Sequence, residues 1–311
     1  MSTQSRTLGD WIFLLLLVLI WGSSFATIKY SIEFFTPFWI AAIRLSLAAI
    51  LMILFAIWRG IQLPQGKKQW LACAIMGSFG TAVPFMLINY ASQYVPSSIA
   101  GLMMATVPIQ VMLMSLIFLP AEKATPIRVL GLICGFLGVS GVILGNGAEE
   151  TAAAAFSLLP FLLLVLATAG YATNGMVSRN VLEMPAMTKS LGVLIFGSLT
   201  ALGCALMFDP LPTGVPLNGW AAITYLAILP TWATTLILYK LLDDTSAAFV
   251  AQSNYLIPAA SIIFGAVLFG EQLAALQFVG FALILFGVAV SEGVIRRRRK
   301  KKRQYPPPPS A

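Results

Sequence analysis

Ten long apolar runs dominate this sequence and constrain its fold more than any other feature. A helix needs about 20 residues to cross about 30 Å of hydrocarbon. The runs that meet this length cover roughly residues 10–29, 37–58, 69–91, 98–119, 126–145, 156–179, 188–207, 218–240, 246–269 and 272–293. They are continuous rather than alternating, which favours helices over a membrane barrel. Only 10% of the residues are charged, so we predict an all-α membrane protein with ten transmembrane helices.

The net charge of +8 comes from one segment near the end of the chain. Residues 296–303 are all basic, and without these eight the remaining 11 basic residues balance the 11 acidic ones. A basic run directly after an apolar helix is typical of a cytoplasmic anchor attracted to anionic lipid headgroups. Nucleic-acid binding would instead need basic residues spread over a folded face. We therefore expect residues 294–311 to form a basic, Pro-rich cytoplasmic tail that contacts lipid and no nucleic acid.

The distribution of Lys and Arg also predicts the orientation. If both termini are cytoplasmic, 17 of the 19 basic residues lie inside, and only Lys29 and Arg44 do not. Such a bias is the usual sign of the cytoplasmic side. The first apolar run is longer than the core of a signal peptide and has no small-residue cleavage site, so we expect it to remain. The expected location is the cytoplasmic (inner) membrane, as a multi-pass protein.

One pattern occurs in both halves of the sequence. Glu122 is followed by glycines 9 and 16 residues later, and Glu271 is followed by glycines at the same two distances. Each half holds five predicted helices, an odd number, so the second copy must enter the membrane inverted. This predicts two inverted-topology repeats, residues 1–147 and 148–293. Inverted repeats are typical of alternating-access transporters, whose substrate site lies between the repeats.

Several short motifs add a family resemblance. They are Trp21-Gly22-Ser23-Ser24-Phe25, Arg44, Pro108 with Glu122, and Pro258 with Gly270-Glu271. Over about residues 10–293 the chain resembles a ten-helix, EamA-type member of the drug/metabolite transporter superfamily. The resemblance implies export or facilitated movement of small metabolites, often amino acids, across a cytoplasmic membrane. It also implies that the fifth and tenth helices are peripheral, which leaves a homodimer open.

Arg44 lies inside the second apolar run, about seven residues from the start of that run. A charged side chain at the centre of a membrane helix costs about 2.5–3.5 kcal/mol on insertion scales. Arg44 therefore either pairs with Glu33 or Glu271, or bonds loop carbonyls, or attracts a substrate carboxylate. The second half has Leu194 at the equivalent position, so any such role belongs to one half only.

Two pairs of residues are related by an offset of 150. Trp21 corresponds to Tyr171, and Ser24 corresponds to Asn174. In each helix the two residues are three apart and share a face, and both pairs fall near the middle of the membrane. We predict that they line a central substrate cavity. The alternative is that they fill the core and join neighbouring helices.

Other polar and aromatic residues complete the predicted substrate site. They are Asn89, Gln110, Trp232, Tyr239, Gln252 and Tyr255. Pro108 and Pro258 lie within apolar runs, where a proline removes a backbone hydrogen bond and bends the helix. We predict a gating role for both prolines, with a static kink as the alternative.

Several residue types that catalytic and metal sites commonly use are absent from the interior of the apolar runs. The chain has no histidine, its three cysteines are far apart, and no acidic residue lies deep in an apolar run. An ordinary proton relay, a metal site and a paired-carboxylate active site all lack their usual residues. We expect no cofactor or metal, and we expect a membrane-embedded enzyme or a passive channel to be a remote alternative.

The predicted function is an alternating-access carrier for small neutral or zwitterionic metabolites. Amino acids are the first class to consider, and the expected direction is outward. A gradient-independent facilitator and a multidrug-type exporter of amphipathic compounds remain alternatives. Phosphorylated substrates are disfavoured, because several phosphates would require several basic residues within the membrane.

Overall fold

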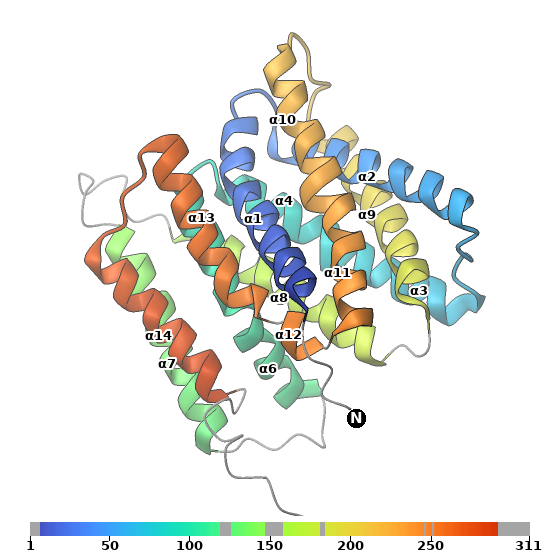
Figure 1. Ribbon diagram of the computed structural model, residues 1–311. Helices are drawn as coiled ribbons and strands as arrows, with labels where there is room; N and C mark the ends of the chain where they lie inside the picture. The colour runs from blue at the N-terminus through green and yellow to red at the C-terminus, as the bar shows by residue number, and fades with distance from the viewer. Residues whose placement is uncertain are drawn as a thin grey trace, which may run out of the picture.

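The computed structural model describes residues 7–118, 126–146, 158–180, 184–245, 247–250 and 252–291, and every regular element within them is helical (Figure 1). The elements are α1 (Leu8–Ser31), α2 (Pro37–Arg59), α3 (Gly66–Gly77), η1 (Ser78–Ala82), α4 (Val83–Ala91), α5 (Ser97–Met103), η2 (Met104–Thr106), α6 (Val107–Phe118), α7 (Pro126–Asn146), α8 (Leu159–Asn180), α9 (Ala186–Phe208), α10 (Leu217–Ala227), η3 (Ile228–Ala233), α11 (Thr234–Asp244), α12 (Ala247–Val250), α13 (Ser253–Phe269) and α14 (Ala275–Ser291). Glu122 and the basic tail lie outside the described residues.

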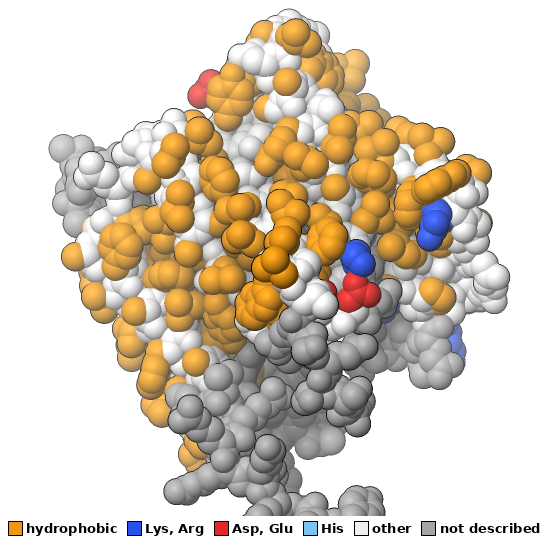
Figure 2. Space-filling model, in the orientation of Figure 1, with side chains coloured by type: hydrophobic (Ala, Val, Ile, Leu, Met, Phe, Trp, Pro, Cys, Tyr) orange, Lys and Arg blue, Asp and Glu red, His pale blue; other side chains and the backbone are white. Residues whose placement is uncertain are grey.

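The helices are those of a multi-pass membrane protein. Within the described residues, six stretches are long and apolar enough to cross a membrane: Leu8–Ser31, Pro37–Arg59, Gly66–Ala91, Ser97–Met114, Ala186–Phe208 and Leu217–Leu238. Shorter apolar helices are Val129–Gly145, Leu159–Gly175, Ser253–Phe269 and Ala275–Val290. Figure 2 shows hydrophobic side chains over most of the visible described surface. The all-helical membrane class is confirmed, and the count of ten spans stays a prediction.

Local sequence explains several helix boundaries. α1 begins with a capping box, in which Thr7 and Asp10 satisfy each other's backbone N–H groups. α2 begins with Pro37 at its first position, where the missing N–H costs nothing. It ends at Gly60, whose φ of 64° is the left-handed conformation that favours glycine. Turn-forming residues thus place the ends of these apolar helices.

The helices pack in pairs that join the two halves of the sequence. α1 lies between α13 and α11, α2 packs along α9, and α7 packs along α14 (Figure 1). At the last contact a Cβ added to Gly138 would lie 2.6 Å from the Gly280 carbonyl oxygen, and the reverse distance is also 2.6 Å. Gly138 therefore serves a contact within the chain. The homodimer stays a prediction.

Candidate functional site

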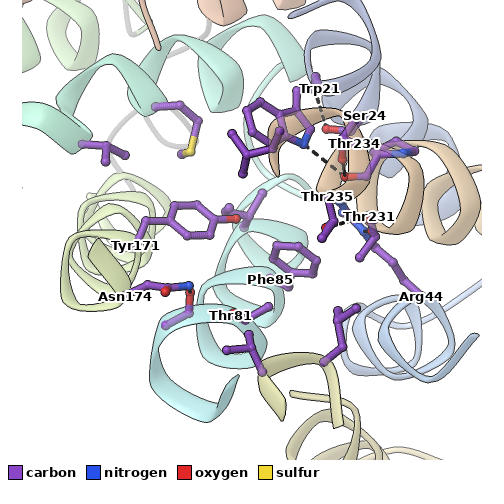
Figure 3. A pocket seen from close by; sticks show the side chains of 18 of the residues that line it. Trp21, Ser24, Arg44, Thr81, Phe85, Tyr171, Asn174, Thr231, Thr234 and Thr235 are labelled. Atoms are coloured by element: carbon purple, nitrogen blue, oxygen red, sulfur yellow. Dashed lines mark hydrogen bonds between the residues drawn. The ribbon is translucent and has the colours of Figure 1, made fainter. Parts of the chain in front are cut away.

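A cavity of about 360 Å³ lies among helices from both halves of the sequence. Its lining includes Trp21 and Ser24 of α1, Arg44 of α2, Phe85 of α4 and Tyr171 of α8. Figure 3 shows these side chains converging with hydroxyl groups of η3 and α11. The volume is within the range of about 300–1,000 Å³ that is usual for small-molecule sites. The cavity therefore has a suitable size for a small metabolite.

Arg44 is held on two sides. Its side chain is 5% exposed, and its Nε donates a hydrogen bond of 2.7 Å to Oγ1 of Thr231. The central carbon of the guanidinium lies 4.1 Å from the centre of the Phe85 ring. This distance places the cation over the ring face, where the ring quadrupole attracts it. Arg44 is thus fixed at the cavity wall by one hydroxyl group and one aromatic ring.

The terminal nitrogens of Arg44 have no hydrogen-bond partner within the described residues, and no carboxylate there pairs with the guanidinium. An arginine has five N–H donors, and the terminal nitrogens of Arg44 are not among the fully buried side-chain atoms that lack a partner in the described structure. The unused donors belong to a residue that lines the cavity. They are therefore suited to bind an anionic group that enters it.

Glu271, one of the suggested partners of Arg44, is engaged elsewhere. Its carboxylate accepts hydrogen bonds from the backbone N–H groups of Ser97 at 2.7 Å and Ser98 at 2.8 Å. These groups are at the start of α5, where unpaired N–H groups and the helix dipole favour an anion. Glu33 is exposed. The ion-pair interpretation of Arg44 is therefore not what the structure shows.

Two π-helical segments border the cavity and are 150 residues apart. η1 interrupts the helix formed by α3 and α4, and η3 interrupts the helix formed by α10 and α11. In each segment a threonine hydroxyl donates to the carbonyl five residues earlier. Thr81 bonds Met76 at 3.1 Å, and Thr231 bonds Leu226 at 2.8 Å. Such π segments are rare and often occur at functional sites.

The two π segments are also bound by the opposite half of the sequence. Trp21 donates from its indole nitrogen to the carbonyl of Pro230 at 3.1 Å. Asn174 donates from its amide to the carbonyl of Gly80 at 3.3 Å. Gly80 and Pro230 are again 150 residues apart. The first helix of each half thus bonds the π segment of the other half.

Six of the predicted site residues line this cavity. They are Trp21, Ser24, Arg44, Asn89, Tyr171 and Asn174. The hydroxyl of Ser24 donates to the backbone carbonyl of Trp21 at 2.6 Å, and the Asn89 amide donates to Pro37 at 3.0 Å. Oδ1 of Asn89 is buried without a partner in the described structure. Their role in substrate binding stays a prediction.

The other predicted site residues are not part of this lining. Gln110, Gln252 and Tyr255 are half-buried in or beside their helices, and Trp232 packs against Phe55 with ring centres 6.2 Å apart. The side chain of Tyr239 lies outside what the structure describes.

The two predicted gating prolines differ in their surroundings. Pro108 is the second residue of α6, directly after the 3₁₀ turn η2, whereas Pro258 lies inside α13. A proline lacks a backbone N–H group, so Pro108 fits the first turn of α6, whereas α13 continues through Pro258 without the hydrogen bond that this N–H would donate. Their gating role stays a prediction.

Sequence reasoning missed Thr231, Lys189 and Asn254, which also line the cavity. Thr231 carried a readable indication, since the 150-residue offset that pairs Trp21 with Tyr171 also pairs Thr81 with Thr231. Lys189 lies in the first turn of α9, near a predicted membrane boundary, and nothing in its spacing indicates the cavity. No group of three or more Cys, Asp or Glu side chains in the described parts is placed to hold a metal ion.

The cavity predicts a pattern of thiol labelling. Cysteine introduced at Ser24 or Asn174 should react with N-ethylmaleimide, because both positions line the cavity. The background would have Cys73, Cys134 and Cys204 replaced by alanine. Ser92→Cys is the control, since Ser92 is fully buried outside the cavity lining and should stay unlabelled. Mass spectrometry measures the reaction, and absence of label at both cavity positions would contradict the cavity.

Comparison with known proteins gives consistent family matches. The model of the EamA-like transporter family matches residues 9–144 and 158–292. An uncharacterized transporter of Archaeoglobus fulgidus is 28% identical over 90% of this chain and 97% of its own length. The uncharacterized inner membrane transporter YedA of Escherichia coli is 26% identical over 88% of this chain and 87% of its own length.

A more distant relative and a solved structure agree with these matches. A WAT1-related chloroplastic protein of Arabidopsis thaliana is 25% identical over 93% of this chain and 70% of its own length. One solved crystal structure covers 95% of this chain with a TM-score of 0.64 and 21% identity, and 100% of its own chain is matched. At this identity the structural match shows a shared fold.

Proposed function

Because the chain belongs to the EamA-like transporter family, we propose that it is an alternating-access carrier for small neutral or zwitterionic metabolites, and that Arg44 binds the carboxylate group of a zwitterionic one. Neutral amino acids are the first class to test. The observation that carries this proposal is the buried guanidinium of Arg44, which lines a cavity of metabolite size with its terminal nitrogens unpaired. A carboxylate is the ligand that matches two parallel N–H donors of arginine.

The charges around the cavity support one carboxylate rather than other charged groups. Arg44 and Lys189 line it, and none of the described lining residues is acidic. A strongly cationic compound would find no carboxylate partner there. A compound with several phosphates would need more than two basic groups. The ammonium group of an amino acid would be left to amide and hydroxyl oxygens, such as those of Asn89, Asn174 and Tyr171.

A second candidate is an exporter of amphipathic compounds. The aromatic part of the lining favours it, since Trp21, Phe85 and Tyr171 all border the cavity. The rings of Phe85 and Tyr171 meet edge to face, with centres 6.4 Å apart. Such rings offer contact area to many apolar groups. A gradient-independent facilitator would use the same cavity without ion coupling.

Two further observations support an arrangement of two repeats. The family model matches two separate parts of the chain, and the π segments and the bonds to Gly80 and Pro230 follow the same 150-residue offset. We propose ten spans in two inverted repeats, residues 1–147 and 148–293, with substrate bound between them. The positions of Lys and Arg support cytoplasmic termini in the cytoplasmic membrane. Export is the proposed direction.

Transport assays with the full chain in proteoliposomes test this function. Radiolabelled neutral L-amino acids should enter with saturation, and unlabelled L-isomers should compete better than D-isomers. Flux that does not saturate would favour a channel, and product formation without flux would favour an enzyme. If none of these amino acids moves but an amphipathic amine does, the second candidate replaces the first.

A further inference from the structure

The guanidinium of Arg44 can present its donors to a ligand only if its orientation is fixed. An arginine side chain has many rotamers, and ordering them costs conformational entropy. In this structure Nε is bound to Thr231 and the planar face rests on Phe85. The edge that remains is the one with the two terminal nitrogens. That edge is the one that forms two parallel hydrogen bonds with a carboxylate.

The hydroxyl of Thr231 has its own direction fixed by the π segment. Its single proton is donated to the carbonyl of Leu226 at 2.8 Å. A hydroxyl group has one proton and two acceptor lone pairs, so towards Arg44 it acts as an acceptor. In an ordinary α-helix a threonine bonds the carbonyl three or four residues earlier. Here the carbonyl is five residues earlier, which requires the wider turn of η3.

The first half of the chain contains the same threonine hydrogen bond in its π segment, but no arginine of the described residues is bonded to that threonine. Thr81 of η1 donates to the carbonyl of Met76 in α3 at 3.1 Å and also lines the cavity. Leu194 stands at the position that corresponds to Arg44. Thr81 therefore has the local structure of Thr231 but no guanidinium to orient. The chain itself thus supplies a matched control.

We propose that Thr231 is a positioning residue for substrate selectivity, which holds Arg44 with its two terminal nitrogens towards the cavity so that they bind a carboxylate. The proposal rests on the proposed function, in which Arg44 binds that carboxylate. Thr231 acts through Arg44 and does not itself contact the carboxylate. Its removal should therefore affect charged ligands more than neutral ligands of the same shape.

Benzoate and benzamide are suitable probes because they have the same ring and a similar shape. Benzoate carries a negatively charged carboxylate, whereas benzamide carries a neutral amide. Calorimetric titration of the purified full chain measures both affinities. Thr231→Val should lower the affinity for benzoate about tenfold and that for benzamide less than about threefold. Thr231→Ser keeps the hydroxyl and should restore the preference for benzoate. Thr81→Val removes the equivalent bond, and any change should fall equally on both probes.

The outcomes separate this inference from the function on which it rests. If Thr231→Val keeps the preference while Arg44→Gln loses it, Thr231 has no positioning role and the carboxylate site stands. If neither variant changes the preference, or if the wild type does not prefer benzoate, the carboxylate site itself is wrong. If Thr231→Val does not fold, Thr231→Ala provides the same test. Serine keeps the hydroxyl group of threonine but lacks its methyl group. If Thr231→Ser also loses the preference for benzoate, the hydroxyl group is not sufficient and the positioning role proposed for it is wrong.

Discussion

Replacing Arg44 by glutamine is expected to lower the affinity for benzoate by about 10–100-fold, while the affinity for benzamide changes by less than about threefold. The reason is that Arg44 is the buried cation whose terminal donors lack partners among the described residues. Hydrogen bonds to charged groups contribute about 1.5–3 kcal/mol. Glutamine keeps part of the length and polarity but removes the charge. Titration calorimetry on the purified chain measures both affinities.

Arg44→Lys is the informative companion variant. Lysine keeps the charge but lacks the planar fork, so it cannot both bond Thr231 and offer two parallel donors. Its preference for benzoate should fall between those of the wild type and Arg44→Gln. Equal loss of affinity for benzoate and benzamide in Arg44→Gln would show that Arg44 is needed for structure rather than for carboxylate recognition.

Replacing Gly138 by leucine is expected to lower the melting temperature of the purified protein by about 10 °C or more. A Cβ at this position would lie 2.6 Å from the Gly280 oxygen and 2.8 Å from the Ile284 nitrogen. Both are backbone atoms of α14, so moving the Ile284 side chain, whose Cγ1 would lie 2.7 Å away, does not relieve the clash. The α7–α14 contact would have to open. Thermal unfolding in detergent measures the effect.

Gly203→Leu is the control for this substitution. Gly203 also lies within a helix, α9, but a Cβ added there meets nothing within 4 Å. Its melting temperature should therefore stay within a few degrees of the wild type, since about 1 kcal/mol moves a protein of this size by about 2–4 °C. If Gly138→Leu is as stable as Gly203→Leu, the close contact of α7 and α14 is not needed for the fold.

The sequence predicted the helices well because their apolar runs are continuous and their ends contain turn-forming residues. The run at about 37–58, for example, corresponds to α2, which Pro37 starts and Gly60 ends. It did not predict the π segments. A π segment adds a residue to one turn and shifts the side chains that follow it around the helix. The run from 218 to 240 is apolar on most of its positions, so this shift leaves no periodic signal and the run reads as a regular helix.

This difference also explains part of the candidate site. Spacing in a regular helix puts Trp232, Thr235 and Tyr239 on one face. In the structure Thr231 and Thr235 line the cavity, whereas Trp232 packs on Phe55. The offset between the halves located Trp21, Ser24, Tyr171 and Asn174 because it compares equivalent positions. The partners of Arg44 and Glu271 could not be predicted, because they depend on contacts between residues far apart in sequence.

The bonds from Trp21 to Pro230 and from Asn174 to Gly80 have a consequence for how the cavity is assembled. Each half supplies a helix that donates a hydrogen bond to the other half's π segment, and residues of both halves line the cavity. The cavity wall therefore contains hydrogen bonds in both directions between the two halves. A movement of one half against the other would have to break or replace these two hydrogen bonds.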